Sequence, residues 1–171
     1  MRKLITITTA IAITLLSVTI LNAQKYGHLN AGNLLQELPA VKAANTQLEA
    51  FQQQLVKKGE EMATAFQTKL EAYIKEADSG VLSKVQMQER EGALSKERED
   101  IVKYEQEVMM KVQEKRQELI EPILKKVDEA IQAVGKENGY KLIFDTSQIN
   151  AILFVQESDD VAPLVKQKLG M

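Results

Sequence analysis

Asp78, Ser79 and Gly80 form the only cluster of turn-forming residues inside a helix-favouring stretch that extends from Pro39 to Val134. Before this cluster, apolar residues recur at spacings of three and four, the pattern of a helix with one contact stripe. After it, apolar residues are sparser, at Leu82, Val85, Leu94, Ile101, Val108, Val112, Leu119, Ile123, Val127, Ile131 and Val134. Pro39 suits the first turn of a helix, because no hydrogen bond is lost there. The stretch therefore predicts two long antiparallel helices that turn at residues 78–80.

The spacing is most regular at the start of the first helix and loosens toward the turn. It runs through Val41, Ala44, Leu48, Phe51 and Leu55, and then through Met62, Phe66, Leu70, Tyr73 and Ala77. The second helix is expected from about residue 81 to residue 134. At 1.5 Å per residue the two helices would measure roughly 55 Å and 80 Å, which fits an extended coiled-coil hairpin better than a globule.

Beyond residue 134 the pattern changes from helical to extended. Residues 140–147 (YKLIFDTS) and 151–156 (AILFVQ) each predict a strand, and residues 25–31 a further, first strand. The strand at 151–156 is apolar on both faces, so both faces must be covered. Either the helices lie over one face, or other subunits complete a small β-containing body. The predicted class is α+β, mostly α.

The N-terminus predicts an export signal. Arg2 and Lys3 precede an apolar run from residue 4 to residue 21, and cleavage is expected after Ala23. Retention as a membrane anchor is the alternative, but six Ser and Thr residues make this run a poor span. The expected division is a signal peptide (1–23), a first strand leading to the arm (24–39), the arm (40–122) and the return helix, strands and last helix (123–171).

Composition excludes several classes of function. Removal of Arg2 and Lys3 with the signal lowers the 22 basic residues to 20 against 24 acidic residues, a net charge of −4. This balance disfavours a nucleic-acid ligand and allows at most peripheral membrane contact. The chain has no Cys, and His28 is its single His, so a zinc site and a Cys-His or Ser-His nucleophile are excluded.

Gly27 and Gly32 have the spacing of a phosphate-binding loop, but Asn33 and Leu34 follow in place of Lys and Ser or Thr. No nucleotide or other cofactor is therefore expected. The many carboxylates alternate with basic residues as on a solvated helix face. We expect a protein that is not an enzyme.

Two segments resemble the Skp/OmpH-like family of periplasmic chaperones. Residues 26–49 (YGHLNAGNLLQELPAVKAANTQLE) are similar to the family's strand, short helix and Pro-containing start of the arm, and residues 115–169 resemble its return helix, strand pair and closing helix. The resemblance implies a homotrimer with a shared β body and three helical tentacles. In that family the tentacles hold unfolded outer-membrane proteins in transit to the outer membrane. The net charge of −4 departs from the family's best-known members, which are strongly basic.

The first hypothesis is therefore a periplasmic holdase that acts without ATP on unfolded outer-membrane proteins. The alternative is an envelope adaptor whose rod docks one fixed partner. For the holdase, the residues expected to contact client are Met62, Phe66, Tyr73, Met87 and Leu94. The residues expected to hold the oligomeric body together are Leu142, Phe144, Ile152 and Phe154.

Overall fold

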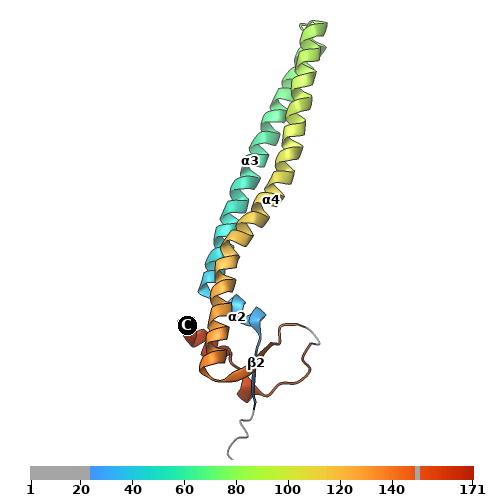
Figure 1. Cartoon of the computed structure of the whole chain (residues 1–171). Helices are drawn as coiled ribbons and strands as arrows, with labels where there is room; N and C mark the ends of the chain where they lie inside the picture. The colour runs from blue at the N-terminus through green and yellow to red at the C-terminus, as the bar shows by residue number, and fades with distance from the viewer. Residues whose placement is uncertain (1–23, 149–150) are drawn as a thin grey trace, which may run out of the picture. The chain divides into compact units, whose positions relative to one another are not determined.

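The computed structural model describes residues 24–148 and 151–171, so the expected signal peptide lies outside the described residues. The chain divides into two compact units. We call Leu35–Val127 the arm, and the described parts of Met1–Leu34 and Asp128–Met171 the body. Two long helices and a small sheet dominate the structure (Figure 1), which confirms the predicted class, α+β and mostly α.

The sheet of the body consists of β1 (Lys25–Leu29) and β2 (Tyr140–Asp145), which pair in parallel with His28 opposite Phe144. Parallel strands need a long crossover connection, because the chain must return to the end at which the first strand began. In this chain the whole helical hairpin is that connection. The pairing of β1 with β2 thus joins segments that are separated by more than a hundred residues.

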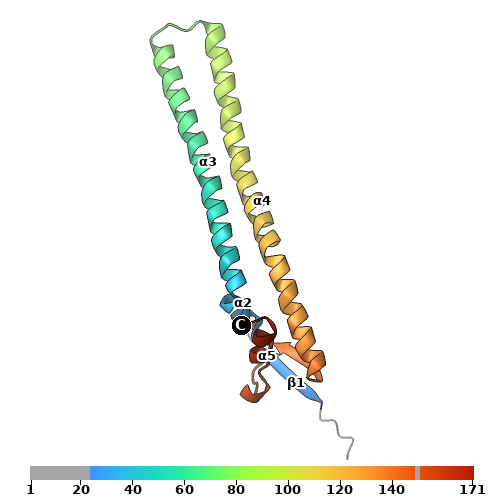
Figure 2. The same ribbon diagram turned by 90° about the vertical axis from the view of Figure 1, so that its left-hand side faces the viewer.

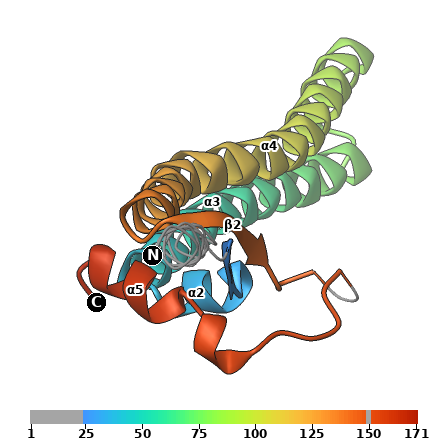
Figure 3. The same cartoon turned by 60° about the horizontal axis from the view of Figure 1, so that its bottom comes forward.

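The strand predicted at 151–156 is wrong, because these residues form an irregular segment between β2 and α5 (Ala162–Lys168) (Figure 3). The free edge of β1 contacts a segment later in the chain. There the Val161 N–H donates to the His28 carbonyl at 2.8 Å. A run of apolar residues forms a strand only when a neighbouring segment supplies hydrogen bonds to its backbone. Within the described residues, the segment has no neighbouring strand, and Leu153 is 88% exposed.

The core of the body is small and lies around β1 and α5. Its most deeply buried side chains are Leu29, Leu34, Val161 and Val165. The first turn of α2 (Ala31–Glu37) is anchored to β2, because the Ala31 N–H donates to the Asp145 carboxylate at 3.1 Å. Burial opposes ionisation of Asp145, yet the hydrogen bonds from Ser147 and Ala31 outweigh it and lower the pKa of this carboxyl group.

The arm contains α3 (Pro39–Asp78) and most of α4 (Lys84–Glu137). The connection is longer than the predicted turn at residues 78–80 (Figure 2), since it continues to Ser83. Ser83 and Gln86 form a reciprocal capping box: the Ser83 N–H donates to Gln86 Oε1 at 2.9 Å, and the Gln86 N–H donates to Ser83 Oγ at 3.3 Å. This cap fixes the start of α4 at Lys84, three residues later than the sequence suggested.

The buried and half-buried positions of α3 follow an eleven-residue repeat. From Leu48 they recur in steps of three, four and four, at Leu48, Phe51, Leu55, Gly59, Met62, Phe66, Leu70, Tyr73 and Ala77. Eleven residues in three turns give about 3.67 residues per turn, close to the value of 3.6 for a straight helix. We call this stripe and its partner on α4 the seam. Its period lets long helices stay in contact without the strong left-handed supercoil of a heptad repeat.

A substitution at Gly27 would test how tightly β1 packs in the body. A Cβ atom on Gly27 would lie 2.7 Å from Val161 Cγ1 and 3.0 Å from the Tyr140 ring. We expect Gly27→Ala to lower the free energy of unfolding by about 1–3 kcal/mol, because Val161 is fully buried and cannot move aside freely. Chemical denaturation followed by circular dichroism measures this change.

The matched control is Gly92→Ala in α4, where nothing lies within 4 Å of the added Cβ atom. This change should raise the free energy of unfolding by about 0.5–1 kcal/mol, since Ala has a higher helix propensity than Gly. Equal stability of the Gly27→Ala variant and the unchanged protein would contradict the packing of β1 on Val161.

Candidate binding surfaces of the arm and body

The five residues predicted to contact client all lie half-buried along the seam. They are Met62, Phe66 and Tyr73 on α3 and Met87 and Leu94 on α4. Their spacing is that of residues that pack one helix against the other. Their side chains therefore hold the hairpin together, and only part of each one is open to solvent.

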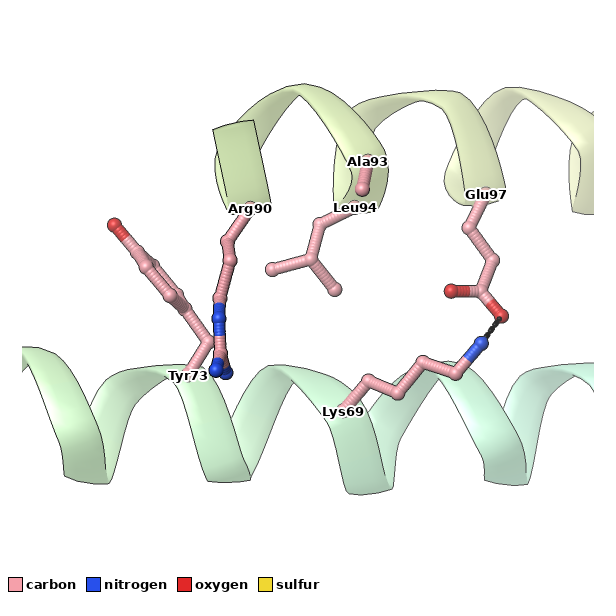
Figure 4. A pocket seen from close by; sticks show the side chains of 6 residues that line it. All are labelled: Lys69, Tyr73, Arg90, Ala93, Leu94 and Glu97. Atoms are coloured by element: carbon pink, nitrogen blue, oxygen red, sulfur yellow. Dashed lines mark hydrogen bonds and ion pairs between the residues drawn. The ribbon is translucent and has the colours of Figure 1, made fainter. Parts of the chain in front are cut away.

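Two of these residues, Tyr73 and Leu94, line a hollow of about 210 Å³ near the tip end of the arm, which we call the tip hollow (Figure 4). Leu94 points from α4 toward α3, while Arg90 extends alongside Tyr73. Lys69 closes one end through an ion pair with Glu97 at 2.7 Å. The lining of the tip hollow is Lys69, Tyr73, Arg90, Ala93, Leu94 and Glu97. Met62, Phe66 and Met87 do not line it.

Tyr73 also joins the helices through a polar contact. Its hydroxyl donates to the Glu91 carboxylate at 2.6 Å. This hydrogen bond is the main cause of a raised pKa at Tyr73, and burial and the negative charge of Glu91 add to it. Tyr73 therefore stays neutral and keeps its donor. Its role in the seam is polar as well as apolar.

A different set of apolar side chains is exposed on one side of the hairpin, which we call the open face. Val56 and Ile74 lie 18 residues apart on α3, which is five full turns, so they point the same way. On α4, Val102 and Met109 lie three residues before and four residues after Glu105 and share its face. The exposed fractions of Val56, Ile74, Val102 and Met109 are 48%, 48%, 49% and 69%.

The two helices share the open face because residues from both line one hollow of about 350 Å³, the Gly59 hollow. Val56, Gly59 and Ala63 line it from α3. Tyr104, Glu105 and Val108 are among its lining residues, from α4. The open face was missed by sequence reasoning because its apolar residues are far apart. The sequence feature that could have identified the open face is the separation of its apolar residues by whole numbers of helical turns.

The opposite side of the arm carries ion pairs. Around α3, Lys69 and Glu76 lie roughly 140° and 160° from Ile74 at 100° per residue. They pair across the seam with Glu97 at 2.7 Å and with Arg90 at 2.9 Å. Such exposed pairs contribute only about 0–1 kcal/mol each to stability. Their main effect is to make this side polar and the open face comparatively apolar.

The body also exposes apolar side chains. Leu142 and Phe144 of β2 are 54% and 45% exposed, and the Phe144 ring lies 6.4 Å from that of Tyr26. Phe154 is 79% exposed, whereas Ile152 is half-buried. The four predicted oligomer residues thus lie on two segments, of which only β2 is a strand.

The described residues hold few groups suited to chemistry. Within residues 24–148 and 151–171, no three His, Cys, Asp or Glu side chains gather as a metal site would require. In the same part of the chain, no helix has both the length and the apolar character needed to cross a bilayer. His28 is used in the fold, where its Nε2 lies 2.8 Å from the Gln156 carbonyl oxygen.

Comparison with known proteins identifies the family. The family described as outer membrane protein (OmpH-like) matches residues 25–169. The chain belongs to the OmpH-like family. A crystal structure from Caulobacter crescentus CB15, described as a candidate OmpH-like outer membrane chaperone, has the same fold with a TM-score of 0.75 at 14% sequence identity. The alignment covers 85% of this chain and 83% of that one. A comparison with curated protein sequences finds no match.

In this OmpH-like chain, the seam and the open face can be separated by mutation. We expect Phe66→Ser to lower the free energy of unfolding by roughly 1–3 kcal/mol, less than the 3–5 kcal/mol typical of truncating a fully buried Phe, because Phe66 is half-buried. Met109→Ser on the open face should change stability by less than about 0.5 kcal/mol. Thermal unfolding of both variants measures the difference. Equal losses would show that Met109 is also a packing residue.

Proposed function

We propose that this OmpH-like protein is a periplasmic holdase chaperone that works without ATP and binds unfolded outer-membrane proteins on their way to the outer membrane. Family membership across residues 25–169 supports a role at the outer membrane. The shared fold with the Caulobacter protein described as a candidate outer membrane chaperone supports the chaperone part. The charged and apolar N-terminal 23 residues support export.

The observation that carries the proposal is the distribution of apolar side chains on the open face. Val56 and Ile74 are about 27 Å apart along α3 at 1.5 Å per residue, with mainly polar residues between them on that face. A folded helical partner would require contacts every three or four residues. Isolated contacts suit an extended, non-native chain, which can touch several of them at once.

Many weak contacts also explain how a client could be held and released without an energy source. Each exposed apolar group can bury only a small area, so each contact breaks easily. Several contacts made by one client raise the overall affinity, because the later contacts form within an existing complex. Release then needs only a competing site, such as the folded state of the client itself. The proposal includes no catalytic step and no cofactor.

We further propose that the protein acts as a homotrimer assembled through the body. Exposed apolar residues of β2 and of the following segment favour a contact with other copies of the chain. Within the described residues, β2 has a strand neighbour on one edge only, and an unpaired edge invites pairing. The arm of each subunit would then contribute contacts to one client, and membrane contact would be peripheral at most.

The holdase proposal is tested with purified mature protein and an outer-membrane β-barrel protein diluted from urea. Light scattering should show suppressed aggregation at about one trimer per client. The variant with Val56, Ile74, Val102 and Met109 all changed to Ser should bind the unfolded client at least about tenfold more weakly, because four partly buried contacts are lost.

The matched control changes Val85 and Met110 to Ser. These residues are 65% and 59% exposed, but they lie off the open face. Client binding by this variant should be unchanged. If the unchanged protein fails to suppress aggregation, the holdase proposal falls, and equal loss in both variants would remove the role of the open face. Crosslinking in cells should recover many β-barrel precursors, whereas one dominant folded partner would indicate an adaptor.

The trimer is tested by Leu142→Asp combined with Phe144→Asp. Charges placed on the exposed face of β2 should dissociate the assembly, since burying an unpaired carboxylate is strongly unfavourable. Sedimentation velocity should show a shift from trimer to monomer, while the helix content measured by circular dichroism stays the same. A monomeric unchanged protein would contradict the proposal.

A further inference from the structure

The Gly59 hollow combines an apolar interior with an acidic margin. Its buried or half-buried lining residues are Leu55, Gly59, Tyr104 and Val108, and Val56 and Ala63 are exposed beside them. Its remaining exposed lining residues are Glu60 and Glu105, one from each helix. No Lys or Arg is among the residues that line it. The tip hollow, in contrast, is lined by both Lys69 and Arg90.

The hollow lies beside Gly59, which occupies a seam position. The neighbouring seam positions on α3 hold Leu55 and Met62, whose side chains reach toward α4. Gly59 has no side chain, and the Tyr104 ring of α4 lies 3.5 Å from where its Cβ atom would be. The volume of about 350 Å³ is at the lower end of the roughly 300–1,000 Å³ of ligand pockets. It is suited to one or two side chains of a longer ligand.

The cation on the same side of α3 as Glu60 is Lys57, which lies three residues before it and roughly 60° from it, and the two residues line a neighbouring hollow. Two further cations lie near Tyr104. The ammonium groups of Lys58 and Lys111 lie 5.3 Å and 6.0 Å from the centre of the Tyr104 ring. At 100° per residue, however, Lys58 is roughly 160° from Glu60 around α3, and Lys111 is roughly 120° from Glu105 around α4. Within the described residues, neither Glu60 nor Glu105 forms an ion pair.

We propose that the Gly59 hollow binds an apolar side chain of an unfolded segment that carries Lys or Arg beside it. The apolar group would bury itself against Gly59, Ala63 and Val108, and the cation would lie between Glu60 and Glu105. This inference rests on the proposed function and adds a class of client segment to it. An anionic ligand, such as a phosphorylated lipid headgroup, would be repelled by the same two carboxylates.

The first test uses two synthetic peptides of about twelve residues that are unfolded in solution. Both contain one Phe and one Leu, flanked by Lys in one peptide and by Glu in the other. The full mature protein should bind the Lys peptide about three- to tenfold more tightly at low salt, since each exposed ion pair contributes little. The difference should shrink at 0.5 M salt, because exposed charges are then screened. Fluorescence anisotropy measures both affinities.

The second test reverses the charges of the hollow. Glu60→Lys combined with Glu105→Lys should invert the preference, so that the Glu peptide binds more tightly. The matched control, Glu61→Lys with Glu114→Lys, changes the net charge equally but lies on other faces, 100° from Glu60 and 180° from Glu105. It should keep the preference for Lys. Ala63→Leu should fill the hollow and weaken binding of both peptides.

Circular dichroism and sedimentation should show that each variant keeps its helix content and assembly. Equal binding of the two peptides by the unchanged protein would overturn the proposal, as would an equal shift in both charge-reversal variants, which would indicate a net-charge effect. In either case, suppressed aggregation of a β-barrel client would leave the proposed holdase function standing. Failure to bind any unfolded chain would remove the holdase function itself.

Discussion

The contact between α3 and α4 is the interaction on which the rest of the structure depends. It is a sparse contact, because Leu38, Ala44, Tyr104 and Val127 are the buried apolar residues of the arm. The remaining seam residues are half-buried, so each contributes only part of the roughly 1.5–3 kcal/mol that full burial of a large apolar side chain would give. The number of such contacts compensates for their small individual contributions, since the seam on α3 repeats from Leu48 to Ala77. A hairpin held in this way uses only one stripe of each helix and leaves the other faces for binding.

The remaining faces of the arm differ from each other, and this difference links the seam to function. Lys69 and Arg90 bind Glu97 and Glu76 on one side, so that side presents charges that are already paired. The open face instead presents isolated apolar side chains among polar ones. Exposed apolar groups in contact with one another would favour self-association. Spacing them by whole numbers of helical turns keeps the contacts separate while still aligning them toward one ligand.

The sequence predicted the parts of this fold that follow from a repeated pattern, and it failed where a single local interaction decides. Steps of three and four identified the seam, including Phe66 and Leu94, because packing of two helices imposes that period. The start of α4 was placed too early because the capping box of Ser83 and Gln86 was overlooked. The continuous apolar run within residues 151–156 suggested a strand, but a strand also needs a neighbouring strand to hydrogen-bond with. The sequence of one segment does not reveal such a neighbour. The seam pattern also led to the prediction that Met62 and Met87 contact client, and this remains a prediction. The open face has no such regular pattern in the sequence.

Gly59 and Tyr104 show how a binding hollow can lie inside a stabilising contact. A Gly in a helix interior costs about 1 kcal/mol relative to Ala, and at a seam position it also removes packing. Tyr104 offsets this loss, because its ring packs over Gly59 and its hydroxyl donates to the Leu55 carbonyl at 3.0 Å. Such a hydrogen bond contributes about 0.5–1.5 kcal/mol. The helices are therefore held together at the very place where a side chain is missing, so the hollow can remain open without separating the hairpin. A side chain larger than that of Ala at position 59 would press against the Tyr104 ring, which already lies 3.5 Å from the Cβ position, and would disturb the contact that borders the hollow.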